Sequence, residues 1–144
     1  MKHVREILAN KGHDVATIMW DRSVLDGLEV LRERGIGALV VTSPTSSLAG
    51  IFSERDVVRA LAELGPRALD MNIAALMSGE VTTCAEDTAI DNLMVLMTDQ
   101  RIRHVPVVHN SEVVGMISIG DVVKWRVDEL EQEKRELLEY VSAR

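Results

Sequence analysis

The sequence predicts an α+β fold in which two layered copies of one unit pack with pseudo-two-fold symmetry. An internal repeat is the first reason: Val15 aligns with Val81, and residues of the same kind recur 66 positions apart. From Gly50, which aligns with Gly115, the offset becomes 65. Two copies are too few for a solenoid, which needs about three units to bury its faces. We therefore expect the copies to cover each other.

The second reason is the hydrophobic pattern within each copy, which predicts the same succession of elements, strand-helix-strand-strand-helix, in both. A short strand is expected near Thr17 and again near Thr83. The helix after it has apolar residues at i, i+4 and i+7, as an amphipathic helix requires. These residues are Val24, Leu28 and Leu31 in the first copy, and Ile90, Met94 and Met97 in the second.

Helix-capping residues support this assignment. Ser23 and Thr88 are the expected N-caps of the two helices, each followed three residues later by an aspartate. Such an acid completes a capping box and carries a favourable charge for the helix N-terminus. Gly35 is expected to end the first helix, because glycine readily adopts the left-handed conformation found there.

Two further strands and a second helix complete each copy. The β-branched runs 38–41 and 104–108 are predicted to be buried strands, each followed by a turn-rich link. The next strands cover 48–53 and 113–118. The closing helices are expected from about Glu54 to Leu64 and from about Ile119 onward.

The chain is expected to comprise an N-terminal segment (1–14), a first motif (15–65), a linker with a second motif (66–125) and a C-terminal helix (126–144). Apolar positions in the last segment need cover, so we expect it to pack against a second copy of the chain. The N-terminal residues Val4, Ile7 and Leu8 are candidates to join that interface.

Composition limits the function classes. Hydrophobic residues make up 47% of the chain and charged residues 27%, which is typical of a globular domain. The net charge of −7 argues against binding to nucleic acid or to an anionic membrane, and no segment is apolar for long enough to cross a bilayer. The single Cys84 cannot form an internal disulfide, so we expect a reducing compartment, the cytosol.

The duplicated segments 50–58 (Gly-Ile-Phe-Ser-Glu-Arg-Asp-Val-Val) and 115–123 (Gly-Met-Ile-Ser-Ile-Gly-Asp-Val-Val) come in the same order within each copy. With the helix and strand before each, this pattern resembles a tandem pair of cystathionine-β-synthase (CBS) domains, the Bateman module. The resemblance implies two clefts between the motifs that bind an adenosyl ligand such as AMP, ATP, NAD or S-adenosylmethionine. It also implies a homodimer that regulates another protein.

The resemblance assigns ribose recognition to the turn after the last strand of each motif, at Ser53 with Asp56 and at Ser118 with Asp121. A carboxylate at a strand end can accept hydrogen bonds from both ribose hydroxyls. The same Ser-x-x-Asp pattern can also be a plain helix cap, and local sequence alone favours that interpretation.

The remaining candidates concern the opposite wall of each cleft and the phosphates. The resemblance pairs Thr17 with Asp121 and Thr83 with Asp56, although both threonines can also be ordinary strand residues. Arg103 and His104 match positions from which related modules reach phosphate, while solvated surface charge is the alternative. The first copy has Gly37 and Ala38 there.

The turn of the first copy carries an extra cation, Arg55, which aligns with Gly120. We therefore expect two clefts of unequal affinity. No catalytic cofactor or metal site is expected, because the chain lacks a Walker loop, a G-x-G-x-x-G segment and a His-Glu-x-x-His motif.

The leading hypothesis is a non-catalytic sensor of adenine nucleotides that signals to a separate partner protein. The alternatives are a ligand-free interaction scaffold, an enzyme that slowly hydrolyses nucleotide with Asp56 or Asp121, and redox-coupled regulation through a thioredoxin-like partner.

Overall fold

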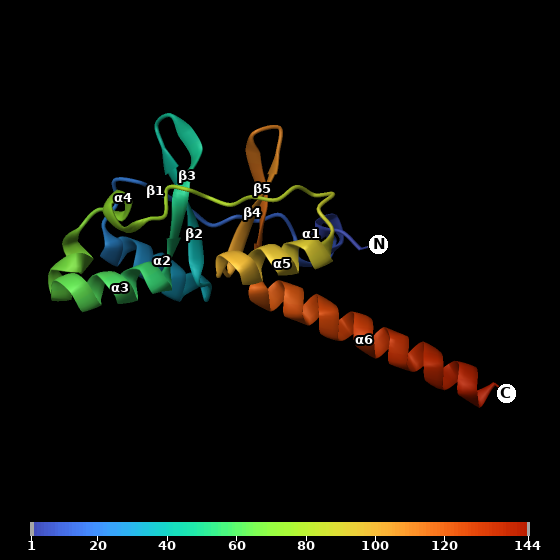
Figure 1. Ribbon diagram of the computed structural model, residues 1–144. Helices are drawn as coiled ribbons and strands as arrows, with labels where there is room; N and C mark the ends of the chain where they lie inside the picture. The colour runs from blue at the N-terminus through green and yellow to red at the C-terminus, as the bar shows by residue number, and fades with distance from the viewer. Residues whose placement is uncertain (1, 144) are drawn as a thin grey trace.

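The computed structural model describes residues 2–143 and confirms the α+β class, with the two copies side by side (Figure 1). The first copy contains β1 (Thr17–Met19), α2 (Val24–Arg34), β2 (Ala38–Ser43), β3 (Ser46–Ser53) and α3 (Glu54–Leu64). A 3₁₀ helix, η1 (Gly65–Asp70), and α4 (Ile73–Leu76) connect the copies. The second copy contains α5 (Ile90–Gln100), β4 (His104–His109), β5 (Glu112–Ser118) and α6 (Ile119–Ser142).

The strands of the two copies pair in the same register. β2 and β3 are antiparallel with Ala38 opposite Ser53, and β4 and β5 are antiparallel with His104 opposite Ser118. β1 pairs in parallel with β2. Its counterpart in the second copy is a single bridge, at Cys84, held by two backbone hydrogen bonds to β4. The strand predicted near Thr83 is therefore reduced to one residue.

Helix capping agrees with the predictions for Ser23 and Gly35 in the first copy, although the carboxylate of Asp26 accepts from Arg22 rather than completing a capping box, and it departs from them in the second. The Oγ of Ser23 accepts a hydrogen bond from the amide of Asp26 (3.0 Å), and Gly35 ends α2 in the left-handed conformation. The N-cap of α5 is Ala89, so the prediction for Thr88 is wrong. Thr88 lies one residue too early, and its Oγ1 accepts a hydrogen bond from the amide of Ala85 instead.

The N-terminal helix α1 (Val4–Lys11) packs within its own chain, which corrects the expectation that it joins a dimer interface. Its apolar residues Val4, Ile7 and Leu8 are buried in the core of the second copy. The amide of Val4 donates to the carbonyl of Thr88 at 2.9 Å.

An equivalent contact in the first copy is made by α4, where the amide of Ile73 donates to the carbonyl of Arg22 at 2.9 Å. Both Val4 and Ile73 are fully buried. Each copy thus begins with a helix that packs against the sheet of the other copy. This exchange ties the two cores together and places Lys11, the last residue of α1, in the cavity between the copies.

Helix α6 is continuous through residue 125, where the sequence analysis placed a boundary. Its first turns pack on the second copy through Val122 and Trp125. The remainder extends away from the body (Figure 1), and every residue from 131 to 142 is exposed. Among the described residues, no helix has the length and apolar character needed to span a membrane.

Candidate functional site

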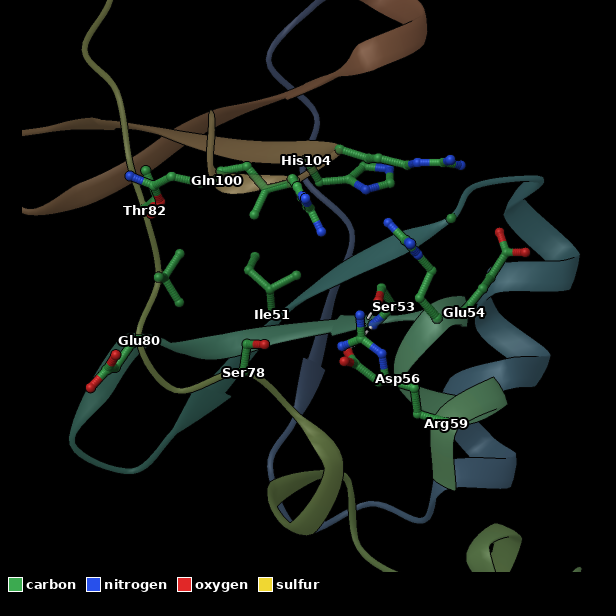
Figure 2. Close-up of a pocket in the computed structure, with 16 residues that line it drawn as sticks. Ile51, Ser53, Glu54, Asp56, Arg59, Ser78, Glu80, Thr82, Gln100 and His104 are labelled. Atoms are coloured by element: carbon green, nitrogen blue, oxygen red, sulfur yellow. Dashed lines mark hydrogen bonds between the residues drawn. The ribbon is translucent and has the colours of Figure 1, made fainter. Parts of the chain in front are cut away.

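Two cavities lie between the copies and are related by the pseudo-two-fold symmetry. The Asp56 cleft has a volume of about 300 Å³ and joins the turn after β3 to the segments 80–82 and 100–104 of the second copy (Figure 2). The Asp121 cleft has a volume of about 640 Å³ and joins the turn after β5 to the segment 34–38 of the first copy. Each cleft thus takes one wall from each copy.

The turns that carry the two aspartates form capping boxes. The amide of Ser53 donates to Oδ2 of Asp56 at 2.8 Å, and the amide of Ser118 donates to Oδ2 of Asp121 at the same distance. The hydroxyl of Ser53 also donates to Oδ2 of Asp56 at 3.1 Å, whereas Ser118 Oγ accepts from the amide of Asp121. The capping interpretation of these motifs is therefore confirmed.

Capping leaves part of each carboxylate available. All the hydrogen bonds that the carboxylates of Asp56 and Asp121 accept end on Oδ2, so within residues 2–143 the Oδ1 atoms accept none. Both side chains line their clefts. An oxygen that faces a cleft at the end of a strand can accept hydrogen bonds from a ligand hydroxyl, so capping and ligand binding are compatible at the same residue.

The Asp56 cleft is rich in arginine. Arg55 and Arg103, both predicted from sequence, line it together with Arg59, Arg101 and His104. The structure therefore brings Arg55 of the first copy into one cavity with Arg103 and His104 of the second. Glu54, Asp56 and Glu80 are the acids on its walls. Guanidinium groups suit bidentate contacts with phosphate oxygens.

Sequence reasoning did not select Arg59 as a site residue. Arg59 lies four residues after Arg55 in α3, which places both on one face of the helix, so this spacing was the signal that could have identified it. Arg101 has a left-handed backbone with φ of 55°, the conformation that Gly35 adopts at the matching position. A non-glycine residue there is uncommon, and its side chain adds a charge that Gly35 cannot supply.

Lys11 forms an ion pair with the carboxylate of Asp121. Its Nζ lies 2.5 Å from Oδ2 of Asp121 and donates a second hydrogen bond, of 2.6 Å, to the carbonyl of Met116. Burial by itself raises the pKa of Asp121, but the hydrogen bonds from Lys11 and Ser118 outweigh it and lower that pKa below its ordinary value. The carboxylate is therefore ionised and already paired.

His104 lies on the walls of both clefts. Burial lowers the pKa of its imidazole, and the positive charge of Lys11 adds to the effect, while the negative charges of Asp121 and Glu54 oppose it without reversing the direction. The neutral imidazole is thus favoured. Gly37 faces it closely, because a Cβ at Gly37 would lie 3.3 Å from Cε1 of His104.

The structure corrects the threonine predictions by one residue. Thr17 and Thr83 are exposed and line neither cleft, while Ala16 lines the Asp121 cleft and Thr82 lines the Asp56 cleft. Successive side chains of an extended chain point to opposite sides, and the buried neighbours Ile18 and Cys84 fix which side faces inward. Thr82 donates from Oγ1 to Oε1 of Gln100 at 2.6 Å.

Comparisons with known proteins agree with this architecture. A family model of the CBS domain matches residues 4–63 and again 73–128, which includes the exchanged helices α1 and α4. A mitochondrial CBS-domain protein of Arabidopsis thaliana, CBSX3, is 34% identical over 147 residues, covering 96% of this chain and 71% of that protein.

Two solved structures have the same fold. A CBS-domain protein of Agrobacterium tumefaciens superposes with a TM-score of 0.84 at 42% identity, over 86% of this chain and 92% of that one. The CBS domain pair of protein MJ0100, solved with 5′-methylthioadenosine and S-adenosyl-L-methionine, gives a TM-score of 0.79 at 25% identity, over 90% and 98%. The chain belongs to the CBS domain family and carries two CBS motifs in tandem.

Proposed function

We propose that the chain is a non-catalytic regulatory module that binds an adenine nucleotide in the Asp56 cleft. The observation that carries this proposal is the free Oδ1 of Asp56 at the end of β3, in a cavity with four arginines. The carboxylate is suited to the ribose hydroxyls. The first amides of α3 and the arginines are suited to phosphate oxygens.

The charge of the Asp56 cleft favours a ligand that carries phosphate, so AMP, ATP and NAD fit it better than a thioether or sulfonium nucleoside. The structure of the MJ0100 domain pair contains 5′-methylthioadenosine and S-adenosyl-L-methionine, which shows that a CBS pair can hold adenosyl compounds without phosphate. In this chain the arginines Arg55, Arg59 and Arg103 would have no phosphate partner on such a ligand, which offers at most one carboxylate.

The Asp121 cleft is proposed to be the weaker site. A ribose hydroxyl that approaches Asp121 competes with the ammonium of Lys11, which is already held by two hydrogen bonds. The segment facing it supplies Gly35, Gly37 and Ala38 where the Asp56 cleft has Arg101, Arg103 and His104. One bound nucleotide per chain is the expected state.

Occupancy of a cleft can act as a signal because each cleft takes walls from both copies. A ligand that contacts both walls stabilises one relative arrangement of the copies, and a protein that recognises this arrangement responds to it. The regulated partner and a homodimeric assembly belong to this proposal.

A thermal-shift panel of AMP, ADP, ATP, NAD, NADH and S-adenosylmethionine tests the proposed function. A ligand at a hundred times its dissociation constant stabilises the fold by about 2.7 kcal/mol, which raises the melting temperature visibly. We expect shifts with the phosphate-bearing compounds. The absence of any shift would favour the scaffold alternative, and ATP turnover above that of a double Asp56→Ala/Asp121→Ala variant would favour an enzyme.

A further inference from the structure

The projecting half of α6 lacks any packing that would stabilise it within one chain. Residues 131–142 are all exposed, including the apolar Leu137 (65%) and Val141 (61%). A helical segment of this length is marginal in water unless an apolar face is buried. A covering partner would supply the missing stabilisation.

Five of the exposed apolar residues of α6 form one seam, and Leu138 and Tyr140 stand beside its C-terminal end. Val123, Val127, Leu130, Leu137 and Val141 follow the alternating spacing of four and three residues of a heptad repeat, with Lys134 at the remaining position. The face that packs on the body instead carries Val122 and Trp125. The seam is therefore free along the whole helix.

Charges of opposite sign flank the two halves of this seam. Lys124 and Arg126 stand on either side of its first half, and Glu131 and Glu133 stand on either side of its second half. All four side chains are exposed. Among residues 2–143, the ion pair that Arg126 forms is a local one, with Glu129. A helix with basic flanks at one end and acidic flanks at the other is complementary to itself when reversed.

We propose that the seam of α6 binds the same seam of a second copy of this chain in an antiparallel pair. With Val127 packed against Leu130 of the second copy, Lys124 lies beside Glu131 and Arg126 beside Glu133 of that copy, and symmetry repeats both pairs. Lys134 then faces Val123 of the second copy, where its aliphatic stem can pack and its ammonium can reach water.

The other arrangements of the two helices are less favourable. A shift by one heptad in the antiparallel pair places Val127 against Leu137 and Val123 against Val141, but it brings Glu131 beside Glu131 and Glu133 beside Glu133 of the second copy. A parallel pair places Lys134 directly against Lys134 in the seam. Both alternatives bring like charges together, which disfavours them.

Reversing the charges beside the seam tests the interface, with self-association of the full chain measured by sedimentation velocity. The wild type is expected to be a dimer at micromolar concentration. Lys124→Glu/Arg126→Glu and Glu131→Lys/Glu133→Lys should each weaken self-association by roughly tenfold or more, because all four pairs become repulsive. A mixture of the two variants should form a heterodimer. A monomeric wild type, or a dimer that neither variant weakens, would overturn the proposal.

Cysteine crosslinking tests the direction of the helices. Val127→Cys mixed with Leu130→Cys should give a disulfide-linked heterodimer, whereas Val127→Cys alone should not crosslink. Efficient crosslinking of Val127→Cys with itself would indicate a parallel pair and overturn the proposed arrangement. The native Cys84 is buried and stays in place as an internal control. The α6 interface rests on the homodimer of the proposed function. None of these measurements requires a nucleotide, whereas the thermal-shift panel measures ligand binding alone, so failure of the interface and failure of the nucleotide site are distinguishable.

Discussion

The Nζ of Lys11 lies 2.5 Å from Oδ2 of Asp121, although the two residues are 110 positions apart in the chain. Asp56, at the matching position of the first copy, has no such ion pair within residues 2–143. The exchange of α1 between the copies creates this difference, because it carries Lys11 from the first copy to the turn of the second. Two clefts built from one repeated unit are thereby made chemically different.

Removing this ammonium should open the Asp121 cleft. Lys11→Met keeps an unbranched apolar side chain but removes the ammonium from Oδ2 of Asp121, which then keeps only its capping bond from Ser118. We therefore expect AMP to bind a second site that is weak or absent in the wild type. Isothermal titration calorimetry gives the stoichiometry. Lys2→Met, at an exposed lysine paired only with Glu6, is the matched control and should leave the stoichiometry unchanged. An unchanged stoichiometry for Lys11→Met would contradict this role.

The arginines of the Asp56 cleft should provide the preference for phosphate. Arg103→Gln is expected to weaken AMP binding by roughly tenfold while adenosine binding changes little, because a charge-assisted contact contributes about 1.5–3 kcal/mol. Arg34→Gln, on the wall of the Asp121 cleft, is the control. Equal losses for AMP and adenosine would mean that Arg103 acts on the fold of the cleft rather than on phosphate.

Two matched glycines test the exchange of helices. A Cβ at Gly115 would lie 2.6 Å from Cδ2 of Leu8, and a Cβ at Gly50 would lie 2.7 Å from both Sδ of Met77 and the carbonyl oxygen of Ser78. Each substitution to alanine should therefore lower the free energy of unfolding, by about 1–3 kcal/mol as overpacking does.

A second substitution, which shortens the side chain that each new Cβ meets, should relieve the two clashes to different extents. Leu8→Ala removes the whole obstacle at Gly115, so Gly115→Ala should cost much less in that background. Met77→Ala leaves the backbone oxygen of Ser78 in place, so Gly50→Ala should remain costly. Urea unfolding of the two double-mutant cycles measures both couplings. Absence of coupling between Leu8 and Gly115 would mean that α1 does not pack on β5.

His104 should make stability depend on pH. The folded state lowers its pKa below the ordinary 6.5, so the unfolded chain binds a proton first as the solution is acidified. The resulting contribution to the free energy of unfolding is present above pH 6.5 and declines as the pH falls below that value. Urea unfolding at a series of pH values measures how the free energy of unfolding changes with pH. His104→Gln should remove the decline below pH 6.5 that His104 causes, while His13→Gln, at an exposed residue, should keep it. Identical slopes for both variants would refute the assignment.

Much of the fold could be predicted because local patterns determine it. The heptad-like spacing of α2, the β-branched runs of β2 and β4 and the helix start at Glu54 depend on neighbouring residues, and the structure reproduces them within a few positions. Arg55, Arg103 and His104 were each identified from the sequence, but their grouping in one cavity is a result of the packing between the copies.

The errors come from contacts between distant parts of the chain. Helices α1 and α4 differ in length, eight residues against four, so the repeat offset changes before Val15 and hides their equivalence. Thr82 was missed in favour of Thr83 because the second copy keeps only one bridged residue, Cys84, to define the inward side. No local pattern around Lys11 indicates that it meets Asp121.

The central claim, that the Asp56 cleft is the principal nucleotide site, is tested most directly by calorimetric titration of AMP into the wild type, Asp56→Ala and Asp121→Ala. Both variants lose a capping box, at a stability cost of about 1 kcal/mol, and Asp121→Ala also loses the ion pair with Lys11. We predict one AMP per wild-type chain, a loss of affinity of at least roughly tenfold for Asp56→Ala, equal to about 1.4 kcal/mol, and near wild-type affinity for Asp121→Ala. Retained binding in Asp56→Ala, or an equal loss in both variants, would contradict the account.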